Sequence, residues 1–294
     1  MSFFTIIDTF PQFQTLWKDN TVRPVPIDRL ELWEKHYMSH WPELLHKQQQ
    51  CYADDQESWM AVARERIMPY LAERFPSMTI AHGHLLQFCE PIYARAVQEL
   101  EQDLDVLFFI YVGIGCGAGW VNTYQGRQAI FLGLEMIAEC NWSDATEIQG
   151  LLAHELGHVF QYQLLTTEGM AIPSGGWWQL FSEGFAQRCE HLILGYDSWH
   201  QSQGVNESNW LAWCMVNRGR LAAMFLDCMR TKGDLRPFFG SWFDIEGHKQ
   251  CGYYLGHEVV RELQRKNSLA EIALMPDYEA AIRSILIQYT HENE

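Results

Sequence analysis

The sequence has few positively charged residues: 21 lysines and arginines stand against 37 aspartates and glutamates, and the formal net charge is -16. Phosphate recognition depends on clustered lysine and arginine side chains, so this balance argues against nucleic acid as a partner. The chain also lacks any apolar run near the ~18 residues that a membrane-spanning helix needs. Its opening, MSFFTIIDTF, has no positive n-region and predicts no signal peptide. We therefore expect no membrane partner.

The eight cysteines form no CxxC pair and no compact disulfide framework. Scattered cysteines in so long a chain predict buried thiols in a reducing compartment, and we expect a cytoplasmic protein. Cys116 and Cys189 are near features discussed below and could in principle bind zinc. Neither has a CxxC partner, and burial as a small apolar side chain explains both equally well.

The chain is rich in core-forming residues, with 48% hydrophobic and 14% aromatic residues in 294. Over the first hundred residues, apolar positions recur at spacings of three and four between charges, which predicts helices. Proline-containing segments, TVRPVPID and ERFPSM, predict breaks between them. We divide the chain into a helical N-terminal region, residues 1–100, and residues 101–294, which carry the chemical motifs. Whether the first region is a separate domain stays open.

Residues 106–112 form a continuous apolar run rich in β-formers, which predicts a buried strand. Residues 113–118 then fit the relaxed dinucleotide-binding pattern G-x-G-x-x-[GA], with Glu135 at a suitable distance. That pattern requires a helix to begin there. The sequence instead continues with WVNTY, a turn at Gln125 and Gly126, and RQAIFL, which predict a β-hairpin. We therefore interpret the glycines as a strand connection.

An exposed strand of this hairpin, WVNTY or QAIFL, would either hold an extended peptide through main-chain hydrogen bonds or simply cover a helix. From residue 134 onward the chain predicts helices almost throughout. The expected fold is α+β with helices dominating. It comprises a helical N-terminal region, a small twisted sheet, the helix that carries the candidate site and a helical C-terminal half.

The segment GLLAHELGHVFQYQ, residues 150–163, places His154 and His158 four residues apart with Glu155 directly after the first. At 100° per residue the two histidines lie about 40° apart on one helix face, which suits adjacent corners of a metal tetrahedron. The apolar residues of this helix centre on the opposite side, so it is expected to pack one way and present its histidines the other. Glu155 falls about 100° from His154, where it suits a base better than a ligand.

A third ligand must come from another segment, and a catalytic zinc keeps its fourth position open for water. Glu183, within LFSEGFA on the next predicted helix, is the strongest candidate. The IPSGG loop before that helix can return the chain antiparallel to the first.

HELGH followed on the next helix by SEGFA resembles the gluzincin metallopeptidases, zinc enzymes with an HExxH helix and a glutamate as third ligand. The resemblance implies a zincin-like fold for residues 101–294, with His154, His158 and Glu183 as zinc ligands and Glu155 as general base. CGYYLG, residues 251–256, resembles the GY-x-x-G segment of a narrower, YjaZ-like group of predicted zinc proteases. The likeness spans about residues 105–262.

In that narrower group the first tyrosine after the glycine would face the substrate oxyanion, which implies Tyr253 here, with Tyr254 and His257 as alternatives. One position departs from better-known gluzincins, which often carry an aspartate four residues after the glutamate ligand to orient a zinc histidine. Here that position is Gln187. A neutral amide brings no charge to raise the basicity of the ligand, so either metal affinity is lower or another acid serves.

The expected function is that of a zinc-dependent metallopeptidase acting on a peptide or protein. Three alternatives stay open: a zinc-dependent hydrolase of a small amide or ester, an inactive zinc-containing protein that binds peptides, and a helical protein without metal. The oligomeric state is not predicted. The remaining histidines that we considered are interpreted as surface or hydrogen-bonded residues and not as ligands: His82, His84, His191, His200 and His248.

Overall fold

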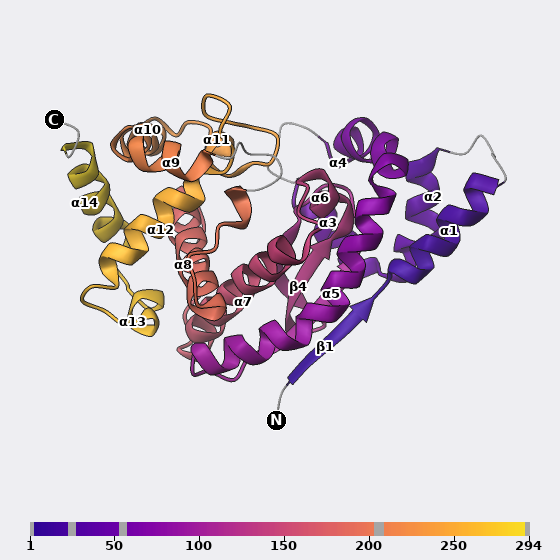
Figure 1. Cartoon of the computed structure of the whole chain (residues 1–294), viewed down its shortest axis with the longest axis horizontal. Coiled ribbons are helices and arrows are strands. Elements are labelled where there is room, and N and C mark those ends of the chain that lie inside the picture. Colours follow the sequence, from indigo (N-terminus) through magenta and orange to yellow (C-terminus); the bar gives the residue numbers. More distant parts are fainter. Residues whose placement is uncertain (1–2, 23–27, 53–57, 203–208, 292–294) are drawn as a thin grey trace. The chain divides into compact units, whose positions relative to one another are not determined.

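The computed structural model describes residues 3–22, 28–52, 58–202 and 209–291. Over these residues it is dominated by helices and contains a small four-stranded mixed sheet (Figure 1), which confirms the helix-rich α+β class. The strands are β1 (Phe3–Asp8), β2 (Asp105–Tyr111), β3 (Gly119–Tyr124) and β4 (Arg127–Gly133). The helices are α1 (Phe10–Val22), α2 (Arg29–His36), α3 (Pro42–Gln50), α4 (Trp59–Val62), α5 (Leu71–Glu99), α6 (Leu134–Glu139), α7 (Ala145–Thr167), α8 (Gly176–Leu194), α9 (Trp210–Val216), α10 (Arg218–Thr231), α11 (Arg236–Phe239), α12 (Cys251–Leu263), α13 (Leu269–Ala273) and α14 (Tyr278–His291).

The chain forms two compact units. The first comprises Met1–Glu90 and Asp105–Ile148, and the second comprises Pro91–Leu104 and Gln149–Glu294. This division differs from the predicted boundary after residue 100, because β2, β3 and β4 belong to the same unit as the N-terminal helices. Trp33 on α2 illustrates this, since its indole N–H donates to the carbonyl of Val112 at the end of β2 (2.8 Å).

The sheet of the first unit has the strand order β1-β2-β4-β3. β1 and β4 both run parallel to β2, while β3 and β4 form the predicted antiparallel hairpin. Its turn residues, Gln125 and Gly126, have φ values of 50° and 79°, in the left-handed region that a tight hairpin turn requires. The prediction of helices throughout the first hundred residues is wrong at β1. QAIFL does not form an exposed strand edge either, because β4 lies between β2 and β3. WVNTY lies in β3, which is an edge strand of the sheet.

No helix begins after β2: the glycine-rich residues lead through a loop into β3, which rules out the dinucleotide-binding arrangement. Glu135 on α6 is fully buried and closes this loop by accepting hydrogen bonds from the amides of Gly113 (2.7 Å) and Gly115 (3.2 Å). Burial raises the pKa of the Glu135 carboxyl to about 7, although these amides act against the increase. Glu135, the acid at the distance that the dinucleotide-binding pattern requires, therefore binds the protein's own backbone.

The predicted break at ERFPSM is wrong, because α5 continues from Leu71 to Glu99 through both Pro76 and Pro91. Four residues of α5 at helical spacing are completely buried: Met78, Ala81, Leu85 and Cys89. Their packing outweighs the loss of a backbone hydrogen bond at each proline. Of TVRPVPID, residues 23–27 lie outside the described part of the chain.

In the second unit, α8 lies between α7 and α12 (Figure 1), and glycines allow both close approaches. A Cβ atom on Gly157 of α7 would lie 2.7 Å from the Cβ of Cys189 on α8. A Cβ atom on Gly184 of α8 would overlap the backbone of Gly256 on α12. Each of the three sequence motifs thus contains a glycine at a helix contact.

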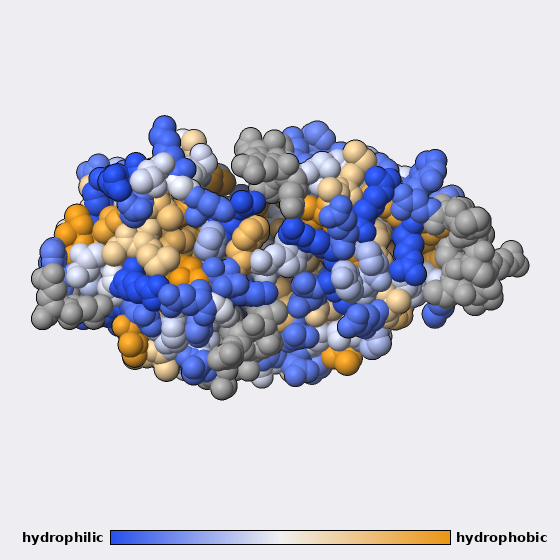
Figure 2. Space-filling model, turned by 90° about the horizontal axis from the view of Figure 1, so that it is seen from above, coloured by the Kyte–Doolittle hydropathy of each residue, from blue (hydrophilic) through white to orange (hydrophobic). Residues whose placement is uncertain are grey.

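Among the helices of the described residues, none combines the length and apolar character needed to cross a membrane. The face shown in Figure 2 is mostly hydrophilic, with apolar side chains in separate patches.

Candidate metal centre

Two histidines of α7 and one glutamate of α8 converge in the second unit. Glu183 Oε2 lies 3.1 Å from Nε2 of His154 and 3.3 Å from Nε2 of His158. The two imidazole centroids are 5.0 Å apart. The structure therefore brings together all three residues that the sequence nominates as ligands, and their ligand atoms lie within 4.8 Å of one another.

These separations fit a tetrahedral ion. Ligand atoms at ~2.1 Å from a zinc ion in tetrahedral geometry stand ~3.4 Å apart, close to the separations found here. The donor set of two imidazole nitrogens and one carboxylate oxygen also matches the N and O ligands that zinc prefers.

The centre is more enclosed than the helical wheel predicts. His154 and His158 are only 2% and 7% exposed, because α8 covers the histidine face of α7. The expectation that α7 presents its histidines away from packed structure is therefore wrong. The Glu183 side chain is 19% exposed, so solvent reaches the centre from the side of this carboxylate.

The proton positions of His158 follow from its neighbours. The Ser182 hydroxyl lies 2.7 Å from Gln161 Oε1 and donates to it. The Ser182 oxygen, 3.1 Å from His158 Nδ1, is then left to accept from this ring nitrogen. With a proton on Nδ1 shared with Ser182, Nε2 of His158, 3.3 Å from Glu183 Oε2, is the ring nitrogen left for a metal.

His154 has a carboxylate behind it. Its Nδ1 lies 3.6 Å from Oε2 of Glu190, which is completely buried on α8. The same oxygen accepts a hydrogen bond from His200 Nδ1 at 2.9 Å. A carboxylate favours a proton on the facing nitrogen, which again leaves Nε2 of His154 as the ligand atom. Gly150 makes room for this arrangement, since a Cβ atom there would lie 2.9 Å from the Cβ of His200.

Gln187, at the position where many gluzincins have aspartate, makes its hydrogen bonds away from the two candidate ligand histidines. Its amide nitrogen donates to the carbonyl of Ser198 (2.8 Å), and its oxygen accepts from Gln201 (2.9 Å). The acid that faces a candidate ligand histidine is Glu190. Sequence reasoning missed this residue, although a signal was present: Glu183 and Glu190 are seven residues apart, two helical turns, and so lie on one face of α8.

Charges in the centre act strongly on one another. Burial acts to lower the pKa of His154, but the carboxylates of Glu183 and Glu190 outweigh it and raise this pKa to about 10. Burial opposes ionisation of Glu183 and Glu190 as well, yet the facing histidines hold the pKa of both carboxyls far below the usual range. The result is a buried cluster in which carboxylates hold imidazoles in place.

Glu155 lies beside the ligand pair and is 4% exposed. Its Oε2 atom has no hydrogen-bond partner among the described residues. Burial raises the pKa of its carboxyl, and His158 and His154 partly counter this effect. A buried carboxylate oxygen without a partner in the described part of the chain, next to three candidate ligands, is what a site for a reactive water requires.

Tyr253, on the first turn of α12, has its ring centroid 5.5 Å from that of His154. It is half-buried, whereas Tyr254 is 3% exposed and packs against Trp199, with centroids 6.0 Å apart. Of the two tyrosines that the sequence nominates, the structure thus places Tyr253 beside a candidate ligand.

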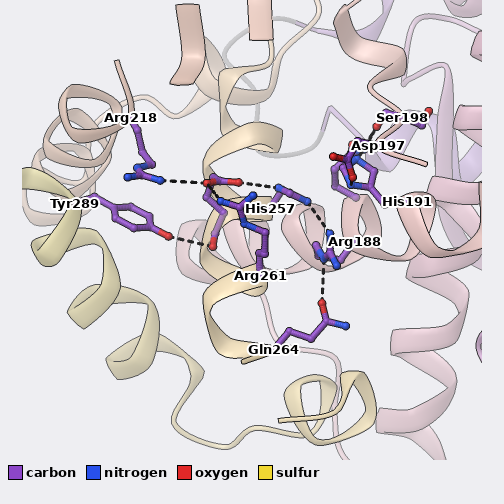
Figure 3. Close-up of polar contacts among 11 residues, drawn as sticks. Arg188, His191, Asp197, Ser198, Arg218, His257, Arg261, Gln264 and Tyr289 are labelled. Atoms are coloured by element: carbon purple, nitrogen blue, oxygen red, sulfur yellow. Dashed lines mark hydrogen bonds and ion pairs between the residues drawn. The ribbon is translucent and has the colours of Figure 1, made fainter. Parts of the chain in front are cut away.

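His257, the third candidate for the oxyanion role, belongs to a polar network between helices (Figure 3). Arg188 Nη1 lies 3.2 Å from Nε2 of His257 and can only donate, so this nitrogen accepts. His257 Nδ1 then donates to Glu258 at 3.2 Å. Burial lowers the pKa of His257 to about 4, in agreement with a neutral ring. Both nitrogens are engaged within the protein, and Glu258 is held further by Arg218 and Arg261.

The five histidines that the sequence analysis considered and did not assign as ligands are hydrogen-bonded. His82 contacts Asp8 (2.9 Å), His84 contacts the carbonyl of Ser143 (2.8 Å), and His191 contacts the carbonyl of Ser198 (2.7 Å). His248 stacks on Trp213 at 4.0 Å between centroids. His200 is hydrogen-bonded too, but its partner Glu190 links it to the centre. No spacing rule in the sequence indicates this role.

Comparisons of the chain with protein-family models, with curated proteins and with solved structures found no match.

Proposed function

We propose that this protein is a zinc-dependent metallopeptidase with a zincin-like fold in the part of the chain that carries the site. The observation that carries the proposal is the convergence of His154, His158 and Glu183 on one point, with Glu155 beside it. Zinc, when bound by these three residues, would supply a Lewis acid that polarises the substrate carbonyl and lowers the pKa of water to about 7.

The chain's own residues supply the proton transfers. The Glu155 carboxylate takes a proton from water as the water oxygen bonds to the carbonyl carbon of the substrate. The carbon–nitrogen bond of the peptide then breaks, and Glu155 returns the proton to the leaving amine. The products are a carboxylic acid and an amine, which become carboxylate and ammonium by proton transfer between them, and Glu155 regains its starting state.

The surrounding residues orient the reacting groups. Ser182 accepts from Nδ1 of His158 and the Glu190 carboxylate faces Nδ1 of His154, which leaves Nε2 of each ring to bind the metal. The Tyr253 hydroxyl, on the ring beside His154, would donate to the oxyanion that forms on the carbonyl oxygen. We also propose a cytoplasmic location, because all eight cysteines are free thiols and thiols stay reduced in that compartment.

The proposal is tested by zinc analysis and peptide cleavage with the wild type and Glu155→Gln. We expect one zinc per chain in both proteins and loss of cleavage in Glu155→Gln alone. Glu168→Gln makes the same chemical change on an exposed residue just after α7 and should behave as the wild type.

Three results would count against the proposal in different ways. A protein that binds no zinc even when reloaded removes the metal site. Zinc-bound Glu155→Gln with full activity rejects the assigned base. Zinc-bound wild type that cleaves small amides or esters but no peptide changes the substrate class.

A further inference from the structure

A hollow of about 400 Å³ adjoins the candidate metal centre and shares Ser182 and Glu183 with it. Because Glu183 is one of the three converging residues, this hollow adjoins the candidate metal position. Its volume falls within the range of small-molecule sites.

The walls of the hollow are mainly apolar. Tyr162 contributes from α7, Ile172 and Pro173 from the connection between α7 and α8, and Trp178 from α8. Trp178 is 6% exposed and is held by ring contacts with Phe181 and Tyr278 (centroids 5.6 and 5.5 Å apart). It therefore forms a firm wall.

Ile172, by contrast, is an apolar side chain with 41% of its surface exposed to solvent. Covering such a side chain with another apolar group stabilises a complex. Together, a fixed indole and an uncovered isoleucine face the same volume beside the ligand Glu183.

The hollow offers no counter-charge to a charged ligand. Of its ten lining residues, Glu183 alone carries a charge, and that carboxylate is directed at the histidines. A charged side chain entering the hollow would lose hydration without gaining an ion pair. The lining therefore selects an uncharged apolar group.

We infer that this hollow binds an apolar side chain of the peptide substrate, on a residue next to the bond that is cut. The inference rests on the proposed function, because a carbonyl held at the metal centre places the neighbouring side chain one residue away, within ~3.5 Å along an extended chain. Ile172 and Trp178 are then the residues that determine specificity.

The test measures binding, so that it does not depend on catalysis. The zinc-loaded full chain is titrated with two α-hydroxamates, one of phenylalanine and one of aspartate, which carry the same metal-binding group. We expect the phenylalanine compound to bind at least about ten-fold more tightly. Ile172→Lys should reduce this preference about ten-fold while zinc content stays constant.

Ile287→Lys is the matched control, since Ile287 on α14 is 44% exposed and does not line the hollow. It should keep the wild-type preference. Equal affinity for the two hydroxamates, or an unchanged preference in Ile172→Lys, overturns the inference. Protein that binds zinc and prefers the phenylalanine compound but cleaves no peptide supports the hollow and rejects the peptidase. Protein that binds no zinc rejects both.

Discussion

Gly184 and Gly256 bring the backbones of α8 and α12 into direct contact. A Cβ atom on Gly256 would stand 2.9 Å from the backbone nitrogen of Gly184, and one on Gly184 would overlap Gly256 itself. Glu183 precedes the first glycine, and Tyr253 lies three residues before the second. The contact thus fixes a candidate ligand and the candidate oxyanion donor relative to each other.

Replacing either glycine by alanine should therefore destabilise the fold. We expect Gly184→Ala and Gly256→Ala each to lower the free energy of unfolding by about 2 kcal/mol or more, because the helices must move apart. Denaturant titration measures the change. Gly83→Ala on α5 is the control, since nothing lies within 4 Å of the added methyl group and it should stabilise by up to about 1 kcal/mol. Similar effects at all three positions would contradict the close-packing argument.

Glu190 and His200 should govern zinc affinity without contacting zinc. Replacing Glu190 by Gln removes the charge that faces His154 Nδ1, and we expect zinc affinity to fall about 10- to 100-fold. His200→Gln should have a smaller effect, since the carboxylate remains. Competition with a chromophoric chelator measures both.

Glu258→Gln is the matched control, because Glu258 is also buried and hydrogen-bonded to a histidine, but in the His257 network. It should leave zinc affinity unchanged. If Glu258→Gln and Glu190→Gln weaken zinc binding alike, general destabilisation is the cause and the positioning role fails.

Tyr253→Phe separates the candidates for the oxyanion role. Loss of one hydrogen-bond donor to a developing oxyanion typically lowers kcat about 10²- to 10³-fold, and we expect this for Tyr253→Phe with zinc content intact. Tyr254→Phe removes the same atom from the adjacent buried ring and should change kcat little. Steady-state kinetics on one peptide substrate measures kcat for both variants. A larger loss of kcat in Tyr254→Phe than in Tyr253→Phe would assign the role to Tyr254.

Glu135 should make stability fall as pH rises. Burial raises its pKa to about 7 in the folded protein, against 4.5 for an ordinary glutamate. Between these values the folded state holds a proton that the unfolded chain releases, so the stabilisation is complete below pH 4.5 and lost as pH passes 7. This difference in pKa between the folded and unfolded states corresponds to about 3 kcal/mol of unfolding free energy.

Urea titrations at several pH values between 4.5 and 8 compare the wild type with Glu135→Gln, which cannot ionise at this position. The difference in unfolding free energy between the two should change by about 3 kcal/mol over this window, in favour of the variant as pH rises. Parallel pH profiles would show that Glu135 is ionised throughout.

Local sequence patterns predicted much of the second unit. Apolar spacing indicated α7, α8, α12 and α14, and helical geometry paired His154 with His158. Glu183 followed from its place on the next helix. These features depend on neighbours within a few residues, which is the range that periodicity describes.

Features that depend on distant segments escaped prediction. β1 is a strand because it pairs with β2, from Phe3↔Asp105 to Asp8↔Ile110, about a hundred residues away. α5 passes through two prolines because its buried face outweighs them. His200 reaches Glu190 from a short segment beyond α8, and only folding brings the two together.

The two units interleave along the chain, since Pro91–Leu104 belongs to the second unit while the segments on either side belong to the first. Neither unit can therefore be excised as one uninterrupted fragment. A truncated protein beginning at residue 101 would carry β2, β3 and β4 without β1 and the helices that share their core, and would leave parallel strand β2 unpaired along one side. The roles of single residues in this protein should therefore be tested by point substitution in the full chain. During synthesis the sheet cannot be complete until residue 133, the last residue of β4, has been added.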